Sequence, residues 1–530
     1  MDMRHKALWS AAVAVAALVL AVSPAGAWQP PTGIPTPPFG ITEVAGPFTH
    51  YVDNTHAAAT DSSNANGSPS KPRLTVPTAL AAGSVVEVRG GPYTIPNGRT
   101  WTGNGTAAAP VFIKGVGSPV FQDTGEKSTI NFSGSYFIVE GVVFNNKALS
   151  TSGATNFTLR GSVVRNYSPG SNSSAIGAGG TNNVIYNNEI HNNGESEGAA
   201  EIDIHGIKVT GGASYLWIVD NHIHHNGGDS IQLGDAQTSG TCGTWPQYIY
   251  IGRNQMHRDR ENAVDVKKAC DVIVSQNTMY DYVARDTSAG DAIVSHDGAK
   301  RVWVIFNEVY DVDMGVGTTG TEGFYVVGNI IRDVDAPGAN TSSFYSSGTA
   351  IYARASTGVQ IVNNTIWRAR MGVSYQSGAG ADFTVVNNII DTLGGFRVGL
   401  NSSSGLSGST INNNLYGGAF SNRVGSTNYS SLSSWQGTGK DTAGLNQPPQ
   451  FVNEAANNYR LGSASPAVNK GTTHSVYQKF FDLYGLSITS DFSGAARPQG
   501  AAYDVGAYEG AGGGGAAGTP PPAPSSLVVK

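Results

Sequence analysis

The segment VIVSQNTM, residues 272–279, contains the pattern that decides the fold. Apolar residues alternate along it, an asparagine follows at Asn277, and another apolar residue comes two positions later at Met279. Eight further segments repeat the pattern, and their asparagines are Asn188, Asn221, Asn254, Asn307, Asn329, Asn364, Asn388 and Asn414. Successive asparagines lie between 22 residues (329 − 307) and 35 residues (364 − 329) apart. One repeat therefore takes 22 or 23 residues, and insertions supply the rest.

A repeat of this length, built from strand-sized apolar runs, is typical of a parallel β-solenoid. Its coils stack about 4.8 Å apart, and each coil buries its apolar residues against the next. Buried turns leave backbone N–H and C=O groups without partners unless a side chain reaches them. We therefore expect the asparagines to form a structural ladder. The sequence predicts an all-β fold, a right-handed parallel β-helix (solenoid) with an N-terminal cap and a C-terminal capping segment.

The ends of the chain differ in composition from the repeats. Residues 1–27 have a basic start, an apolar core and a small-residue cleavage site, which indicate a signal peptide cleaved near Ala27. No later segment has the roughly 20 apolar residues of a membrane span. We expect a secreted protein, extracellular or periplasmic, that is monomeric and has no membrane insertion. The other predicted divisions are a Pro-rich leader at 28–48, an N-terminal cap with the first strands at 49–125, the β-helix at 126–425, a C-terminal capping segment at 426–510 and a Gly/Pro-rich linker tail at 511–530.

Charged residues are scarce, so a local concentration of them is informative. They make up 13% of the chain, about half the usual share, and the net charge is −6. A nucleic-acid partner is not expected, because such proteins normally carry a basic patch. The stretch ENAVDVKKACD, residues 261–271, nevertheless contains two lysines and three acids.

A second column of apolar residues precedes the asparagine segments and predicts which side chains face outward. We align it on Ile207, Ile231, Val264, Ile293, Val316, Ile351 and Val373. Side chains alternate along a strand, so the residues one and three positions after each inward anchor point outward. In the middle coils these outward residues are polar or ionisable, and they include Lys208, Gln232, Asp265, Lys267, His296, Tyr352 and Arg354.

Acidic side chains cluster at the start of the same strands. Asp229, Asn262 and Asp291 occupy one position on three consecutive coils, with Glu261 beside them and Asp265 further along the strand. Stacked acids repel one another unless a cation lies between them. Calcium takes six to eight oxygen ligands, which Asp, Glu and Asn side chains supply. We predict a Ca²⁺ site formed by these five residues.

The same patch suits β-elimination on an acidic, uronate-containing polysaccharide. A cation on the uronate carboxylate stabilises the carbanion that forms when the C5 proton leaves. Lys267 is the predicted base, because cationic neighbours such as Arg354 or calcium lower a lysine pKa. His296 or Tyr352 then protonates or stabilises the leaving oxygen. The predicted substrate contacts are Lys208, Gln232, Tyr352 and Trp245, the last of which lies in a loop where it can stack on a sugar ring.

The segments AVDVKKACDVIVSQNT (263–278) and IVSHDG (293–298) resemble the alginate lyase and chondroitinase B family of polysaccharide lyases. The remainder of the chain is similar to secreted bacterial parallel β-helix proteins in general. The resemblance implies that Lys267 is the catalytic base and that His296 stands where the family has an arginine. The calcium-binding acids of the family fall on Arg260 and Asn262, so Glu261 and Asp265 are expected to substitute for them.

Two other functions stay open at this point. A glycoside hydrolase needs paired carboxylates, which Asp229 with Asp265, or Asp265 with Asp291, can provide across coils. A non-catalytic, glycan-binding surface protein also fits, because solenoids offer long binding faces. His222 and His224 share a face but lack a clear third metal ligand, so they are expected to be exposed strand residues.

The remaining polar features have structural interpretations. Cys242 and Cys270 are the two cysteines of the chain, and we expect a disulfide between them because the protein is exported. Asp491, Arg497 and Asp504 lie in the C-terminal capping segment, where we expect polar contacts that close the fold.

Overall fold

The computed structural model describes residues 47–510 with nine gaps, three of which are single residues. The gaps are residues 124, 126–127, 199–201, 238, 286–287, 336–347, 377–381, 393–397 and 404, of which 124 and 126–127 flank one described residue. The predicted signal peptide, nearly all of the Pro-rich leader and the predicted tail lie outside the described residues.

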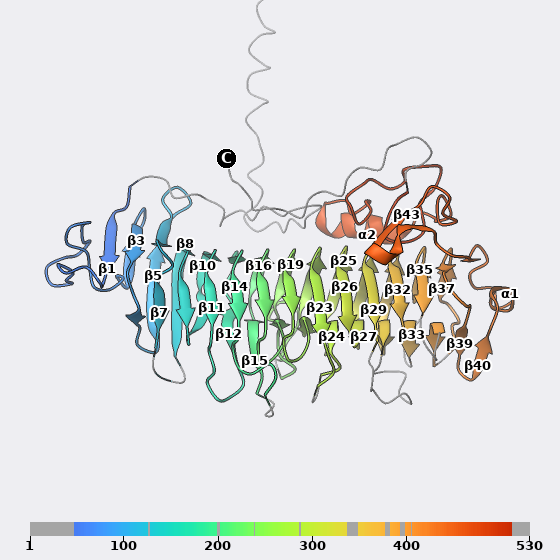
Figure 1. Cartoon of the computed structure of the whole chain (residues 1–530), viewed down its shortest axis with the longest axis horizontal. Helices are drawn as coiled ribbons and strands as arrows, with labels where there is room; N and C mark the ends of the chain where they lie inside the picture. The colour runs from blue at the N-terminus through green and yellow to red at the C-terminus, as the bar shows by residue number, and fades with distance from the viewer. Residues whose placement is uncertain are drawn as a thin grey trace, which may run out of the picture.

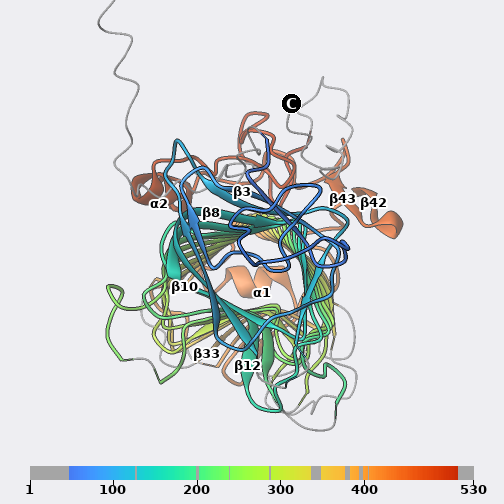
Figure 2. The same cartoon turned by 90° about the vertical axis from the view of Figure 1, so that its left-hand side faces the viewer.

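Most coils contain three strands, and the strands of a coil pair in parallel with their equivalents in the next coil. One complete coil consists of β21 (Val264–Lys267), β22 (Cys270–Ser275) and β23 (Thr278–Tyr282). Figure 1 shows the coils stacked along one axis, and Figure 2 shows them superposed along that axis. The prediction of an all-β parallel β-helix is confirmed.

The strands form three faces, which we call the anchor face, the helix-covered face and the third face. The long strands β8 and β10 bend and run through both the anchor face and the helix-covered face. The anchor face consists of β2 (Ala79–Ala81), β5 (Arg99–Asn104), β8 (Thr129–Glu140), β10 (Ala148–Arg160), β12 (Ser173–Ala178), β15 (Ile204–Val209), β18 (Ile231–Leu233), β21, β24 (Asp291–His296), β27 (Met314–Thr319), β30 (Thr349–Arg354), β33 (Met371–Gln376), β36 (Val398–Ser402) and β39 (Asn422–Val424). The helix-covered face consists of β1 (His50–Asp53), β3 (Val85–Arg89), β6 (Val111–Gly115), β8, β10, β13 (Val184–Tyr186), β16 (Ser214–Val219), β19 (Gln247–Gly252), β22, β25 (Lys300–Ile305), β28 (Glu322–Val327), β31 (Thr357–Val362), β34 (Thr384–Val386) and β37 (Thr410–Asn412). The third face consists of β4 (Tyr93–Thr94), β7 (Val120–Gln122), β9 (Val143–Asn145), β11 (Val163–Arg165), β14 (Glu189–His191), β17 (His222–His224), β20 (Gln255–His257), β23, β26 (Glu308–Val312), β29 (Ile330–Val334), β32 (Thr365–Ala369), β35 (Ile389–Thr392), β38 (Leu415–Tyr416) and β41 (Leu445–Asn446).

The predicted inward anchors lie in register and in the core. Consecutive coils pair Ile207 with Ile231, Ile231 with Val264 and Val264 with Ile293. The remaining anchors, Val316, Ile351 and Val373, continue the same row. All seven are completely buried in the main hydrophobic core. The alignment made from the sequence is therefore the alignment of the structure.

The asparagine ladder is also confirmed. The side-chain amide of Asn254 donates to Oδ1 of Asn277 at 3.0 Å, and that of Asn277 donates to Oδ1 of Asn307 at 2.9 Å. The ladder begins at Asn188 and continues through all nine predicted asparagines. It ends where Asn414 donates to a carboxylate, Asp441 Oδ1, at 2.9 Å.

A second, shorter ladder was not predicted. Asn193 donates to Asn226 Oδ1 and Asn226 donates to Asp259 Oδ1, both at 2.8 Å. These residues each follow an asparagine of the first ladder by five positions, and this spacing in the sequence could have revealed them. Burial raises the pKa of Asp259 to about 7, although four hydrogen bonds oppose this effect.

The C-terminal segment covers the end of the core and one side of the stack. Trp435 of α1 (Leu432–Gln436) is fully buried in the main core, and both figures place this helix across the C-terminal end of the coils. Phe480 of α2 (Ser475–Tyr484) packs edge-on against Trp303 of β25, with ring centroids 4.8 Å apart. No helix within the described ranges has the length and apolarity needed to cross a membrane. The other elements near this end are β40 (Thr427–Tyr429), β42 (Phe451–Asn453), η1 (Glu454–Ala456) and β43 (Asn458–Leu461).

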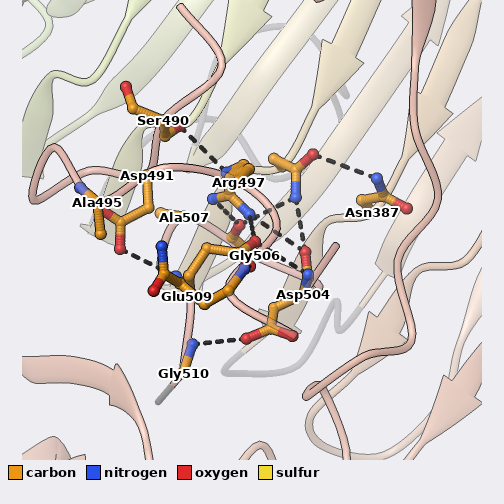
Figure 3. A network of polar contacts seen from close by, with 12 residues as sticks. Asn387, Ser490, Asp491, Ala495, Arg497, Asp504, Gly506, Ala507, Glu509 and Gly510 are labelled. Atoms are coloured by element: carbon orange, nitrogen blue, oxygen red, sulfur yellow. Dashed lines mark hydrogen bonds and ion pairs between the residues drawn. The ribbon is translucent and has the colours of Figure 1, made fainter. Parts of the chain in front are cut away.

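A buried polar network closes the last described segment (Figure 3). Arg497 Nη1 lies 2.6 Å from Glu509 Oε1, and both side chains are fully buried. Arg497 Nη2 donates to the carbonyl of Gly506 at 2.8 Å. Asp491 accepts the backbone N–H of Glu509, and Asp504 accepts that of Gly510. These contacts hold the last described segment against the rest of the fold.

Candidate functional site

The candidate site lies on the outer side of the anchor face, where β15, β18, β21 and β24 run next to one another. Strand pairing places Lys208 beside Gln232 and Gln232 beside Asp265. On the next pair of coils Lys267 lies beside His296. The polar residues that the sequence analysis assigned to the outward columns of these coils are therefore neighbours in space.

Asp265 is the centre of a short chain of charged side chains. Its Oδ2 lies 2.8 Å from Lys267 Nζ, and its Oδ1 lies 2.8 Å from His296 Nε2. His296 Nδ1 in turn lies 3.1 Å from Asp297 Oδ2. Asp265 is buried, whereas Lys267 and His296 are partly exposed to solvent. A substrate on this face would therefore meet the two bases rather than the carboxylate that holds them.

The protonation of these two bases follows from their neighbours. Burial by itself lowers the pKa of Lys267, but the charge and hydrogen bond of Asp265, together with the charges of Asp229 and Glu261, raise it above its ordinary value. Burial likewise lowers the pKa of His296, yet Asp265 and then Asp297 outweigh burial and raise it. Lys267 therefore keeps its proton at neutral pH.

Three potential metal ligands converge next to this chain. His205, Asp229 and Glu261 each offer a ligand atom, and these atoms all lie within 4.8 Å of one another. His205 was not among the residues predicted for the site. It stands two positions before its anchor Ile207, as Asp229 does before Ile231, so the column that identified Asp229 also contained His205.

The electrostatics of this cluster favour a bound cation. Burial, followed by the charges of Asp229, Asp203 and Asp265, raises the pKa of Glu261 to about 9. Burial also acts to raise the pKa of Asp229, but His205 and then Lys267 and Asn262 bring it below its ordinary value. Without a cation Glu261 therefore holds a proton near neutral pH, and the donor set of one imidazole and two carboxylates can hold a divalent cation in place of that proton.

The other residues of the predicted metal site have different contacts. Asn262 donates its amide to Asp229 Oδ1 at 2.9 Å, and its own Oδ1 accepts the backbone N–H of Asp291 and the hydroxyl of Ser288. Asp291 is buried and hydrogen-bonded to Tyr352, and burial is the main cause that raises its pKa to about 7. The predicted five-residue set therefore divides, with Asp229 and Glu261 in one cluster, Asp265 paired to the bases, and Asn262 and Asp291 engaged in the coil stacking.

The predicted substrate contacts Lys208 and Gln232 line a cavity of about 340 Å³ together with His205 and Lys267. Lys208 Nζ lies 3.1 Å from Asp235 Oδ2, which lines the same cavity. Gln232 donates to Asp229 at 3.2 Å and so contacts the cation cluster. The cavity is therefore continuous with both groups of candidate functional residues.

Two predicted site residues lie further away. Arg354 is exposed and pairs with Thr319, which places it three coils from Lys267, or about 14 Å along the axis at ~4.8 Å per coil. Trp245 has only 9% of its surface exposed, so its ring offers little area for stacking on a sugar, and we do not keep it in the site.

The predicted disulfide is confirmed. Cys242 and Cys270 are bonded, with Cα atoms 5.6 Å apart. The bond attaches the loop after β18 to the start of β22, one strand after Lys267. A disulfide of this kind fits an oxidising compartment outside the cytosol.

No family model matches the chain, and no curated protein matches it. Among solved structures, the pectate lyase Pel9A shares 16% identity and a TM-score of 0.41, covering 87% of this chain and 97% of that one. The PL6 family alginate lyase AlyGC shares 15% identity and a TM-score of 0.47 over 64% of this chain and 51% of that one. The GH136 lacto-N-biosidase from Eubacterium ramulus shares 15% identity and a TM-score of 0.38 over 75% of this chain and 67% of that one. At these values the similarities do not discriminate between activities, and the fold rests on the strand pairing.

Proposed function

We propose that this chain is a secreted polysaccharide lyase that cleaves an acidic, uronate-containing polysaccharide by cation-assisted β-elimination. The observation that carries the proposal is the adjacency of two groups beside one cavity, which Lys267 of the first group and His205 of the second line. The chain of Lys267, Asp265 and His296 lies beside the cluster of His205, Asp229 and Glu261, where the raised pKa of Glu261 means that a bound cation would take the place of its proton.

The residues of the chain have complementary roles in such a reaction. Elimination breaks the C5–H bond and the bond from C4 to the glycosidic oxygen, and a C4–C5 double bond forms. Lys267 in its neutral form removes the C5 proton, and His296 in its protonated form, which Asp265 and Asp297 favour, gives a proton to the leaving oxygen. Lys208 and Gln232 are placed to bind the polymer in the same cavity, and Arg354 is placed to contact it three coils away.

The protonated state of Lys267 defines what a cation must do. The charges that raise the pKa of Lys267 are those of Asp265, Asp229 and Glu261. Asp229 and Glu261 are also the acids that His205 joins in the metal-ligand cluster. Ca²⁺ takes oxygen ligands, so the carboxylates of Asp229 and Glu261 would hold it rather than the His205 imidazole; when bound, it would balance the charge of these acids and polarise the substrate carboxylate. The proposal therefore predicts that activity requires the cation.

The test is to incubate the protein with a panel of uronate polysaccharides, with added Ca²⁺ or with chelator, and to follow the ultraviolet absorbance of the unsaturated product. We expect a rise that needs Ca²⁺ and disappears in Lys267→Ala. Lys268→Ala is the matched control, because it removes the neighbouring lysine and is expected to keep activity. A calcium-independent rise, or full activity in Lys267→Ala, would contradict the proposal.

A glycoside hydrolase is the second candidate, because Asp265 and Asp291 are two buried acids on neighbouring strands of this face. Burial first, and then the charge of Asp265, raises the pKa of Asp291 to about 7, so Asp291 can act as an acid near neutral pH. The same assay separates the two reactions. Hydrolysis releases reducing ends without the unsaturated absorbance, and binding without either product indicates a glycan-binding protein.

A further inference from the structure

A second group of potential metal ligands lies on the third face of the β-helix. Glu189 of β14 and His222 and His224 of β17 each offer a ligand atom, and these atoms all lie within 4.8 Å of one another. His257 of β20 adds another imidazole, with its Nε2 2.9 Å from His222 Nε2. The four side chains come from three consecutive coils.

The strand register brings these residues together. Glu189 pairs with His222, and His224 pairs with His257. His222 and His224 are two positions apart on one strand, so their side chains leave the same side of the sheet. Two histidines on one strand with ligands on both neighbouring strands surround a point above the sheet. The third ligand that the sequence did not reveal is therefore supplied by the preceding coil.

The hydrogen bonding of the cluster leaves ligand atoms free. Among the described residues, His224 Nε2 and His257 Nδ1 are buried and have no hydrogen-bond partner. The nearest oxygen to His224 Nε2 within the cluster is Glu189 Oε1 at 3.5 Å, beyond the length of a normal hydrogen bond. Buried polar atoms are normally paired, so the unpaired Nε2 of His224, which lies within the converging ligand set, calls for a ligand.

Ring stacking alone does not account for the arrangement. His191, His224, His257 and Tyr280 form a stacked column with centroids 4.7–5.1 Å apart. Stacking explains why these rings lie parallel to one another. It does not explain why His222 and Glu189, from the adjacent column, turn their polar atoms toward His224.

We propose that Glu189, His222 and His224 bind a transition-metal ion of the Zn²⁺ type, with His257 as a fourth ligand. Imidazole nitrogen with one carboxylate suits Zn²⁺ and similar ions, whereas calcium prefers oxygen alone. The ion would link β14, β17 and β20 on the outside of the stack. This site is separate from the candidate active site on the anchor face and does not depend on the proposed function.

The test is titration of the chelator-treated full chain with ZnCl₂ by isothermal calorimetry. We expect binding that is lost or weakened in His222→Ala/His224→Ala by at least the roughly 10- to 100-fold that loss of an outer-shell partner costs a metal site. His205→Ala, in the other cluster, and His56→Ala, near the N-terminus, are the controls and should keep this binding.

Glu189→Gln provides a variant whose folding is not in question, because its side chain is 46% exposed. It should also weaken Zn²⁺ binding while its far-ultraviolet circular dichroism stays that of the wild type. Zn²⁺ should raise the thermal unfolding midpoint of the wild type and have a smaller effect on these variants. Absence of Zn²⁺ binding by the wild type, or an isotherm unchanged in His222→Ala/His224→Ala, would overturn the proposal.

Discussion

Truncation of one asparagine in the ladder should cost the fold several kilocalories per mole. Asn277 accepts two hydrogen bonds at Oδ1, from the backbone N–H and the amide of Asn254, at 2.9 and 3.0 Å. Its own amide donates to the carbonyls of Ile251 and Ser275 and to Asn307 Oδ1. The substitution Asn277→Ala removes all five bonds at a buried position.

The expected magnitude follows from the groups that are left without partners. In Asn277→Ala the backbone N–H of Asn254 and one hydrogen of its amide both lose their acceptor. A buried polar group left unsatisfied costs about 1–3 kcal/mol, so the two together predict a loss of about 2–6 kcal/mol. Asn307 Oδ1 loses one of its two hydrogen bonds but is not left unsatisfied, because it still accepts the backbone N–H of residue 277.

Urea unfolding of the full chain, followed by circular dichroism, measures this loss. Asn428→Ala is the matched control, because Asn428 lies exposed in β40 and is not part of either ladder. An exposed substitution of this kind is expected to change stability by less than about 0.5 kcal/mol. If Asn277→Ala unfolds at the same urea concentration as Asn428→Ala, the ladder does not stabilise the coils as argued.

Three further predictions concern the disulfide, the C-terminal network and the bases of the candidate site. Reduction of the disulfide, which closes a sequence separation of 28 residues, should destabilise the fold by about 3.5 kcal/mol, measured as a lower urea midpoint under reducing conditions; an unchanged midpoint would contradict this. Arg497→Ala leaves the carboxylate of Glu509 buried without its partner and should cost about 3–5 kcal/mol in the same assay, whereas Arg497 would be dispensable if the loss were under about 1 kcal/mol. Asp265→Asn removes the carboxylate that raises the pKa of His296, so the titration of this imidazole followed by NMR should move to lower pH; an unchanged or higher pKa would show that Asp265 does not hold the proton on His296.

Much of the fold was readable from the sequence because one residue type marks every coil. Asn277 and its equivalents are required at one buried turn, so their positions give the register of the flanking strands. The separate alignment on the apolar anchors correctly placed Lys267 beside His296 and Asp265 beside Gln232. Alternation within each strand then separated the inward anchors from the outward side chains.

The candidate metal ligands were harder to recognise, because ligand sets depend on which coils meet and not on sequence motifs. Glu189 and His222 each follow a ladder asparagine by one position, so the ladder alignment does contain their pairing. These two residues lie in the strand after the asparagine, whereas the outward columns predicted from the sequence lie in the strands before it. The burial of Trp245 could not be predicted in this way, because the loop that contains it is an insertion with no equivalent in other coils.

The constant spacing of the ladder separates the length of the molecule from the length of its sequence. From Asn188 to Asp441 the ladder has nine steps, or about 43 Å at ~4.8 Å per step. A step of 22 residues, such as Asn307 to Asn329, advances the axis as far as the 35-residue step that follows it. Loops between strands can therefore grow, shrink or change composition without altering the distance between any two outward side chains on a face. Variation in such proteins can reshape the walls around a binding surface while the surface keeps its spacing.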